Sequence, residues 1–386
     1  MTYDFDSPLS RRGSGCYKWD VDDSDSDVIP MWVADMDFPV APEIQQALAS
    51  RMSHPVFGYT KVPPSFYDAI KLWHKNYCNY DVDADSVIYT SGVVPALSAI
   101  IKAMTSPGDA VLLLTPVYNC FFSSVRNNRC RVVECPLDRS GDSYRFNPRS
   151  FVSAIMDNDV KLFVLCNPHN PAGRVWTPAE LIAMGEVCKQ LGVTVVSDEI
   201  HSGIIMPGNK FTSFAALGPS YDDICITASS SSKTFNTAGL QIAYIITKNP
   251  VWRAQIDKAI NVNEVCDVNP FGVAALTAAY TLGEPWRLQL CDYVWHNYVA
   301  LCQAFASSMP RAHVLRLEGT YLVWVDIRDT GMSSAQAHDR LLREAKVRVS
   351  PGTIYGQAGE GYIRINIACP RSQLNEALLR MKSVLA

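Results

Sequence analysis

The chain has 386 residues, of which 48% are hydrophobic and 19% are charged, a composition ordinary for a globular protein. A formal net charge of −4 gives no excess of basic groups to attract nucleic acid or an anionic membrane. The acidic N-terminus lacks the apolar core of a signal peptide, and no apolar run is long enough for a membrane span, so we expect a soluble cytoplasmic protein.

Cysteine and histidine usage points away from disulfides and metal sites. The twelve cysteines are scattered singly, without a CxxC pair, and most lie in apolar runs, which indicates buried reduced thiols. The seven histidines show no zinc-binding spacing. We therefore expect no bound metal.

The first 40 residues contain no convincing helix. Residues 22–27 have the composition of an acidic, serine-rich loop. Residues 28–39 mix apolar and acidic side chains without a period of 2 or 3.6, so this segment is expected to pack against another part of the chain. Helices are then predicted over 42–52 and 63–77, each of which starts near a proline.

From about residue 86, short apolar runs alternate with helical patterns. This alternation predicts a mostly parallel sheet covered by helices on both faces. The predicted strands are residues 87–90, 110–114, 130–135, 161–166, 194–198, 224–228 and 242–247. The predicted helices are residues 94–105, 178–191, 250–285 and 286–309.

The last quarter of the chain has the pattern of a smaller α+β domain. Its predicted strands are 313–317, 321–327, 347–349 and 362–367, and its predicted helices are 333–345 and 371–386. We therefore expect three parts. These are an N-terminal segment, 1–45, that packs with the small domain and the active site, a large cofactor-binding domain, 46–285, and a small domain, 286–386.

Polar or aromatic groups follow five of the predicted strands. In open parallel sheets, ligands bind outside the carboxyl ends of the strands. The groups are a helix start at Gly92, Val93 and Val94, the ring of Tyr118, the amide of Asn170, the carboxylate of Asp198 and the amine of Lys233. Such a set matches the needs of pyridoxal phosphate (PLP): a lysine for the imine, a carboxylate for the pyridine nitrogen, a stacking ring, an amide for the phenolic oxygen and N–H groups for the phosphate.

Three runs resemble the fold-type I, class I/II aminotransferase family in residues, order and spacing. They are Asn-Pro-His-Asn-Pro-Ala-Gly at 167–173, Ser-Asp-Glu-Ile-His at 197–201 and Ser-Lys-Thr-Phe-Asn-x-x-Gly-Leu at 232–240. The resemblance covers nearly the whole chain. It implies a three-layer α/β/α large domain with a mostly parallel seven-stranded sheet, a smaller α+β domain, and PLP held as a Schiff base to Lys233.

Within that family, the chain is similar to the MalY/PatB group of cystathionine β-lyases, or C–S lyases. The similarity lies in Met-Trp-Val-Ala-Asp-Met-Asp-Phe-Pro at 31–39, Phe-Gly-Tyr-Thr at 57–60 and the lysine motif. It implies a homodimer in which Tyr59 reaches the phosphate of the neighbouring subunit's cofactor. Class I aminotransferases usually carry a phosphate-binding arginine eight residues after the lysine, whereas this chain has Gln241, which is compatible with the lyase branch.

The family pattern assigns a role to each candidate residue. The expected catalytic residues are Lys233, Tyr118 and Asp198. The expected cofactor ligands are Gly92, Val93, Val94, Tyr118, Asn170, Asp198, His201, Ser230, Ser232, Lys233 and, across the dimer, Tyr59. The expected substrate ligands are Arg364, Val33, Ala34 and Asn170.

Each assignment has a plainer alternative. Arg364, inside an apolar strand, could form a buried salt bridge instead of binding the α-carboxylate of the substrate. His201, where the family commonly has a tyrosine, could be a core histidine. Tyr118 could likewise be plain core, and Ser230 and Ser232 could simply form a loop. Further alternatives are a solvated surface lysine for Lys233, a helix cap for Asp198 and a turn for Asn170.

The resemblance implies β-elimination from an L-cysteine S-conjugate such as L-cystathionine, giving a thiol, pyruvate and ammonia. An aminotransferase shares every step through removal of the α-proton, so the cofactor motifs do not separate the two reactions. A third alternative is a regulatory protein that binds PLP with little catalysis.

Overall fold

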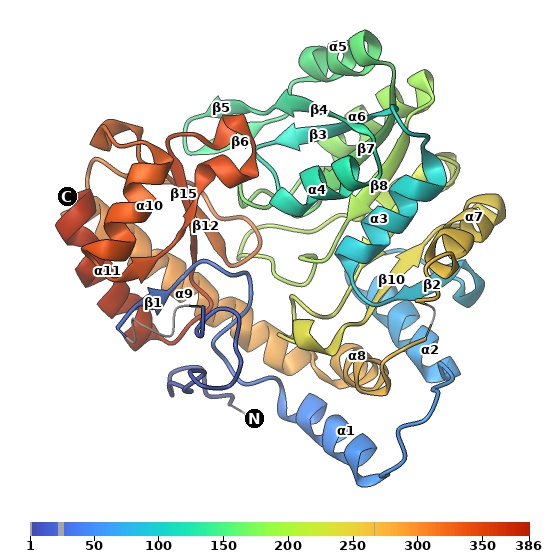
Figure 1. Ribbon diagram of the computed structural model, residues 1–386, viewed down its shortest axis with the longest axis horizontal. Coiled ribbons are helices and arrows are strands. Elements are labelled where there is room, and N and C mark those ends of the chain that lie inside the picture. The colour runs from blue at the N-terminus through green and yellow to red at the C-terminus, as the bar shows by residue number, and fades with distance from the viewer. Residues whose placement is uncertain (1, 22–26, 266) are drawn as a thin grey trace.

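The computed structural model describes residues 2–21, 27–265 and 267–386 (Figure 1). Most of the predicted acidic loop therefore lies outside the described residues. The large sheet has the order β2 (Val87–Thr90), β10 (Ala243–Ile246), β9 (Cys225–Ser229), β8 (Thr194–Asp198), β7 (Val160–Cys166), β3 (Ala110–Thr115) and β4 (Arg131–Pro136). β10 is antiparallel to both neighbours and the other pairs are parallel, which confirms the mostly parallel seven-stranded sheet.

Helices cover both faces of this sheet because its strands are apolar on both sides. Along β3, Val111 and Leu113 pack into one apolar cluster and Leu112 and Leu114 into another. The first cluster is covered by α3 (Val93–Met104), α4 (Asn119–Asn127) and α7 (Pro250–Asn261). The second is covered by α2 (Pro64–Trp73), α5 (Pro148–Asn158), α6 (Pro178–Leu191) and α8 (Pro270–Leu282). The result is the expected three-layer α/β/α arrangement, with α1 (Pro42–Ser53) packed on α8.

The C-terminal part has its own antiparallel sheet. Its order is β11 (His313–Val314), β12 (Leu322–Asp326), β15 (Tyr362–Asn366) and β14 (Ser350–Pro351). Its helices are α9 (Glu284–Ser308), α10 (Ser334–Arg343) and α11 (Arg371–Leu385). The N-terminal segment joins this part through the parallel pair β1 (Ile29–Pro30) and β13 (Val347–Arg348). The division of the chain at residues 45 and 285 stays a prediction.

The prediction of one helix over 250–285 is wrong. α7 ends at Asn261 and α8 begins at Pro270, where Asn269 caps the new helix by accepting a hydrogen bond from the backbone N–H of Phe271 at 3.0 Å. A proline lacks the N–H that a helix interior requires and disfavours helical backbone in the residue before it. The helix predicted over 63–77 likewise ends as an α-helix at Trp73 and continues as a π-helical turn, His74–Cys78.

Several elements were not predicted. They are α4, α5 and the hairpin of β5 (Asp138–Ser140) and β6 (Ser143–Arg145). Across the described ranges, no helix is both long and apolar enough to cross a membrane. The eleven described cysteines are all free thiols, and most of them are buried.

Candidate active site

A cavity of about 190 Å³ opens where the strands of the large sheet end. It brings together most of the predicted site residues: Ala34, Gly92, Val93, Val94, Tyr118, Asn170, Asp198, His201, Ser232 and Lys233. These side chains come from segments that are far apart in the chain. The strand order therefore gathers at one place the groups that follow β2, β3, β7, β8 and β9.

Lys233 lies in the loop after β9. Burial and the nearby Arg364 cation lower the pKa of its amine, Asp35 and Asp198 oppose the shift, and the pKa is about 8 as a result. The Nζ atom donates a hydrogen bond to the carbonyl oxygen of Ala34 at 2.5 Å. A lysine in this state has a substantial neutral fraction near pH 8, which is the form that attacks an aldehyde.

Asp198 ends β8 with its side chain buried. Burial raises the pKa of this carboxyl group to about 7, although a hydrogen bond from the backbone N–H of Ile200 at 3.1 Å and the charge of Lys233 favour the ionised form. No described cation lies within ion-pair distance of Asp198. Its charge is therefore open to a protonated ring nitrogen from a ligand, which fits the pyridine of PLP.

The neighbouring Glu199 points elsewhere. Its Oε1 accepts hydrogen bonds from the hydroxyls of Ser197 at 2.8 Å and Ser213 at 3.0 Å and from the backbone N–H of Phe214 at 3.0 Å. This carboxylate is fully buried and does not line the cavity. The arrangement joins the end of β8 to the loop before residue 214.

Arg364 is a buried cation on β15, 4% exposed. It donates to the Oδ1 atom of Asn170 at 3.1 Å and to the carbonyl oxygen of Trp32 at 2.6 Å. Its Nε has no hydrogen-bond partner among the described residues, and no described carboxylate forms an ion pair with it. The described residues therefore do not support a buried salt bridge for Arg364. An anionic ligand would provide the negative charge that this arginine lacks.

Asn170 lines the cavity beside this arginine. Because its Oδ1 accepts from Arg364, the side-chain amide has a fixed orientation. Its Nδ2 hydrogens remain for another acceptor, such as the phenolic oxygen of PLP. One residue thus contacts both the cation and the cavity.

His201 and Tyr118 also line the cavity. Burial, with the charges of Lys233 and Arg364, holds the pKa of His201 well below its ordinary value, and its Nδ1 has no partner in the described structure. The imidazole is therefore neutral. Burial raises the pKa of Tyr118, so its hydroxyl stays protonated. Both side chains can donate or accept at a ligand without a change of charge.

The N-terminus of α3 lines one side of the cavity and suits a phosphate group. Gly92 is the N-cap, and the backbone N–H groups of Val93 and Val94 belong to the first turn, which lacks intrahelical partners. Ser232 lines this cavity. Ser230 does not, because its hydroxyl donates to the carbonyl oxygen of Ile242 at 2.7 Å and accepts from the N–H of Ser232 at 3.0 Å.

Two more predicted residues lie away from the cavity. Tyr59 is 96% exposed in the loop between α1 and α2. Val33 does not line the cavity, but its carbonyl oxygen accepts from the Nδ2 atom of Asn366 at 2.6 Å. Val33 therefore holds the N-terminal segment in place, and Tyr59 does not line the cavity of its own chain.

The structure adds residues that the motifs did not identify. The cavity is also lined by Ser91, Pro95, Cys166, Ile200, Ala238, Gln241 and Ile242. In the sequence, Gln241 differs from the aminotransferase pattern, and the structure places it at the cavity. Tyr321, at the start of an apolar run, has the sequence pattern of a core aromatic, yet its hydroxyl donates to the carbonyl oxygen of Ala34 at 3.0 Å.

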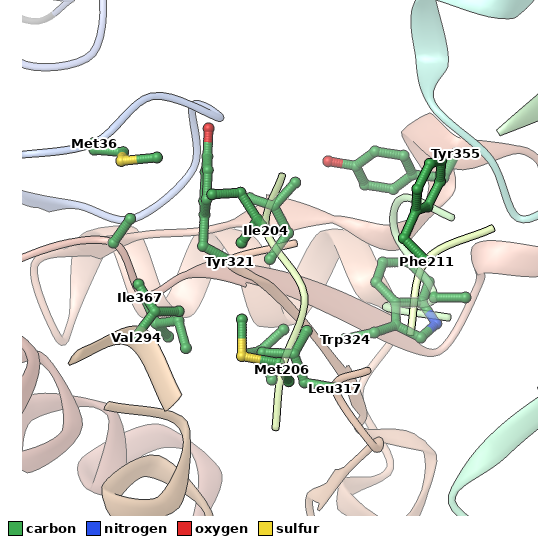
Figure 2. Packing of buried hydrophobic residues seen from close by; sticks show 14 of the residues in the cluster. Met36, Ile204, Met206, Phe211, Val294, Leu317, Tyr321, Trp324, Tyr355 and Ile367 are labelled. Carbon is green, nitrogen blue, oxygen red and sulfur yellow. The ribbon is translucent and has the colours of Figure 1, made fainter. Parts of the chain in front are cut away.

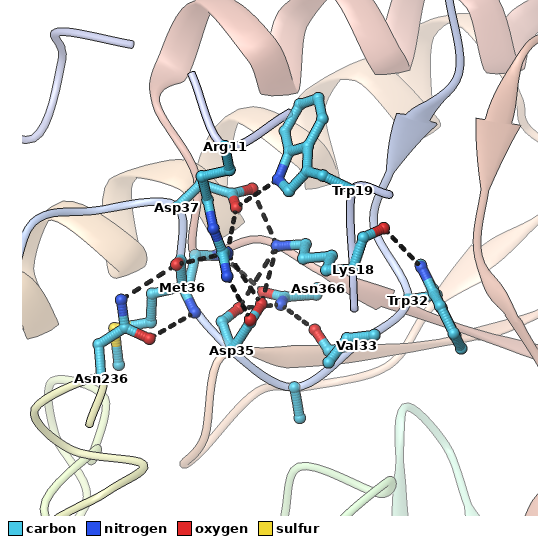
Figure 3. Close-up of polar contacts among 12 residues, drawn as sticks. Arg11, Lys18, Trp19, Trp32, Val33, Asp35, Met36, Asp37, Asn236 and Asn366 are labelled. Carbon is cyan, nitrogen blue, oxygen red and sulfur yellow. Dashed lines mark hydrogen bonds and ion pairs between the residues drawn. The ribbon is translucent and has the colours of Figure 1, made fainter. Parts of the chain in front are cut away.

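A buried polar cluster fixes the N-terminal segment against the site (Figure 3). Asp37, 2% exposed, accepts from Lys18 at 2.8 Å and from Arg11 at 2.8 Å. Asn236, three residues after the lysine, accepts from the N–H of Met36 at 3.0 Å and donates to its carbonyl oxygen at 3.0 Å. The segment that carries Ala34 is thus tied directly to the loop that carries Lys233.

Comparison with known proteins defines the class. The family model described as aminotransferase class I and II matches residues 26–381. The chain therefore belongs to the class I and II aminotransferase family. Its seven-stranded sheet, small antiparallel domain and strand-end lysine are those expected from the resemblance in the sequence.

Within this family, the chain is similar along its whole length to several individual proteins. It is 38% identical over 385 residues to cystathionine beta-lyase PatB of Bacillus subtilis, with 99% of this chain and 100% of that protein covered. It is 30% identical to the protein MalY of Escherichia coli over 97% of each. The structure of cystalysin from Treponema denticola, which contains pyridoxal 5'-phosphate, superimposes with a TM-score of 0.96 at 32% identity, covering 99% of this chain and 98% of that one.

Proposed function

We propose that this protein is a PLP-dependent C–S β-lyase that cleaves L-cystathionine or a related L-cysteine S-conjugate. The observation that carries the proposal is the pairing of a lysine amine in the cavity with a buried arginine, Arg364, which lies behind the cavity wall and is hydrogen-bonded to the wall residue Asn170. The buried carboxylate of Asp198 is the third charged group of this site. The similarity to PatB along the whole chain, together with Gln241 in place of an arginine, supports lyase rather than aminotransferase chemistry.

When bound, PLP supplies an electron sink for the pair of electrons left at Cα of the amino acid. Asp198 keeps the proton on the pyridine nitrogen, because its buried carboxylate is stabilised by that positive charge. Lys233 would hold the cofactor through its amine, and the free amine would remove the α-proton of the substrate. Its lowered pKa makes the neutral amine available for that step.

Arg364 binds the α-carboxylate of the substrate with its planar pair of donors. Asn170 fixes the guanidinium through its Oδ1 and donates from Nδ2 toward the phenolic oxygen of the cofactor. His201 faces the same region as a neutral imidazole. The N-terminus of α3 and Ser232 hold the phosphate group.

The C–S bond then breaks with its electron pair on sulfur, and the thiolate takes a proton from Tyr118 or from the Tyr59 of a neighbouring subunit. Hydrolysis of the remaining three-carbon fragment gives pyruvate and ammonia. The overall reaction consumes one water and releases one thiol, one pyruvate and one ammonium ion.

The test is direct. Purified protein loaded with PLP is incubated with L-cystathionine, and pyruvate and free thiol are measured. We expect the two products in equal amounts. Amino-group transfer to a keto acid without thiol would contradict the lyase proposal, and a PLP absorbance band that never responds to amino acids would indicate a regulatory protein.

An aminotransferase is the second candidate because the family model that matches the chain carries that name. The same residues bind the cofactor and remove the α-proton in both reactions. Amino-group transfer differs from elimination in the atom to which the proton returns. This difference arises only after Lys233 has removed the α-proton. Measuring glutamate formed from 2-oxoglutarate detects this reaction.

We also infer a homodimer in which Tyr59 completes the neighbouring site. The loop that carries Tyr59 exposes two further apolar side chains, Val56 at 62% and Phe57 at 57%. Exposed apolar side chains grouped on one loop suit a protein interface. Within its own chain, Tyr59 does not line the cavity.

A further inference from the structure

One backbone atom receives two side-chain donors at the edge of the cavity. The carbonyl oxygen of Ala34 accepts from the Nζ atom of Lys233 at 2.5 Å and from the hydroxyl of Tyr321 at 3.0 Å. The Tyr321 side chain is fully buried and does not itself line the cavity. Its hydroxyl therefore acts on the lysine through the carbonyl.

Tyr321 is held firmly in that position. Figure 2 shows its ring beside Ile204, with the hydroxyl directed away from the apolar side chains of Met206 and Leu317. The carbonyl oxygen of Tyr321 accepts from the N–H of Ile367 at 3.0 Å. The ring also meets His201 edge to face, with 5.9 Å between the centroids.

The residue before Tyr321 has an unusual backbone. Thr320 is β-branched and buried, yet its φ is +71°, a region that L-residues rarely adopt. Two hydrogen bonds keep it there, from its N–H to the carbonyl oxygen of Ile204 at 2.8 Å and to its Oγ1 from the N–H of Leu322 at 3.1 Å. Backbone strain that is held by its surroundings concentrates at functional sites.

We propose that Tyr321 is a positioning residue for Lys233, acting through the carbonyl group of Ala34. This inference rests on the proposed function, since it takes Lys233 as the base that removes the α-proton. The Ala34 oxygen is the docking point of the amine whenever it is not joined to the cofactor. The Tyr321 hydroxyl fixes that oxygen, so the amine stays where it can take the proton from Cα and return it.

The first test is the exchange of the α-proton of L-alanine in D₂O, catalysed by the PLP-loaded enzyme and followed by NMR. Alanine has no leaving group at Cβ, so exchange requires neither elimination nor a second substrate. Tyr321→Phe removes only the hydroxyl. We expect the exchange rate at saturating alanine to fall about tenfold, because one hydrogen bond is lost. The KM for alanine should stay within about twofold of the wild-type value.

The second test uses the full chain without cofactor. Reductive methylation of Lys233 is followed by peptide mass spectrometry, and we expect it to be severalfold faster in Tyr321→Phe, because the amine is held less tightly. Tyr298→Phe is the matched control. Its hydroxyl also donates to a backbone carbonyl, that of Leu315 at 3.1 Å, but lies outside the cavity.

An unchanged methylation rate, or an exchange defect confined to KM, overturns the inference. So does an equal effect of Tyr298→Phe, which would reflect a general loss of stability. If the wild-type enzyme neither exchanges the alanine proton nor cleaves L-cystathionine, the proposed function fails. The methylation measurement still decides the role of Tyr321 in that case, because it requires no cofactor.

Discussion

At the scale of single residues, the site is a set of buried charges that protein groups compensate only in part. Asp198 has a raised pKa and no described cation within ion-pair distance, and Arg364 has no described carboxylate partner. Leaving such groups unpaired costs stability in the empty protein. A ligand with a cationic ring nitrogen and an anionic carboxylate removes both costs, so the protein is complementary to a PLP-bound amino acid.

The lowered pKa of Lys233 predicts a pH profile. In protein without cofactor, only the neutral amine is methylated, so the rate should rise with pH and level off above about pH 8 rather than near the ordinary value of 10.5. Arg364→Met should move the inflection upward, because the arginine cation helps to lower this pKa. An inflection near 10.5 in the wild type would contradict the enclosed position of the amine.

Arg364→Lys should raise the KM for the amino-acid substrate by about tenfold or more while the cofactor absorbance stays unchanged, because a lysine lacks the planar fork that grips a carboxylate. Steady-state kinetics and an absorbance spectrum measure the two effects. Arg328→Lys is the control, since that arginine is exposed and pairs with Asp326. Unchanged KM in Arg364→Lys would remove the carboxylate-binding role.

At the scale of elements, the N-terminal segment connects the C-terminal part of the chain with the loop that carries Lys233. It pairs through β1 with β13, and it bonds through Met36 to Asn236 of the lysine loop. The polar cluster around Asp37 fixes its course (Figure 3). A segment without helical or strand periodicity thereby contributes Ala34 to the lining of the cavity.

Asp37→Asn should lower the free energy of unfolding by about 3 kcal/mol, because it leaves Lys18 buried without a full counter-charge. Asp142→Asn, at an exposed pair with Arg316, should change it by less than about 1 kcal/mol. Denaturant unfolding followed by tryptophan fluorescence measures both. Similar values for the two variants would show that the cluster does not stabilise the fold.

The same cluster makes the stability of the fold depend on pH. Burial alone would raise the pKa of Asp37, but Lys18, Trp19 and Arg11 outweigh it and hold the pKa below the ordinary value of 3.8. A depressed carboxyl pKa stabilises the fold above the unfolded value, and that contribution is lost as the pH falls through the folded value. The wild type should therefore lose stability below about pH 4 more steeply than Asp37→Asn.

The elements differ in how far the sequence determines them. The strands of the large sheet are apolar on both faces, so their positions were predicted within a few residues. The break between α7 and α8 was missed even though Pro270 is visible in the sequence, because the apolar pattern on either side is helical. Tyr321 was missed because its hydroxyl meets Ala34, a residue nearly 290 positions away, and no local pattern reports such a contact.

At the scale of the whole molecule, the proposed role of the exposed Tyr59 predicts a homodimer with shared active sites. Lys233→Ala and Tyr59→Ala variants should each be nearly inactive. Mixed after dissociation and reassociation, they should regain about a quarter of the wild-type activity, because half of the dimers are hybrids with one intact site. No recovery on mixing, with dimers confirmed by light scattering, would place Tyr59 outside the neighbouring site.

The central claim is that the carbanion made at this site expels a sulfur leaving group rather than passing its amino group on. One measurement tests it most directly: PLP-loaded enzyme, L-cystathionine and 2-oxoglutarate in one tube, with pyruvate, thiol and glutamate followed together by NMR. We predict pyruvate and thiol in equal amounts and little glutamate, with all three abolished in Lys233→Ala. Glutamate formed without pyruvate would contradict the claim and make the protein an aminotransferase.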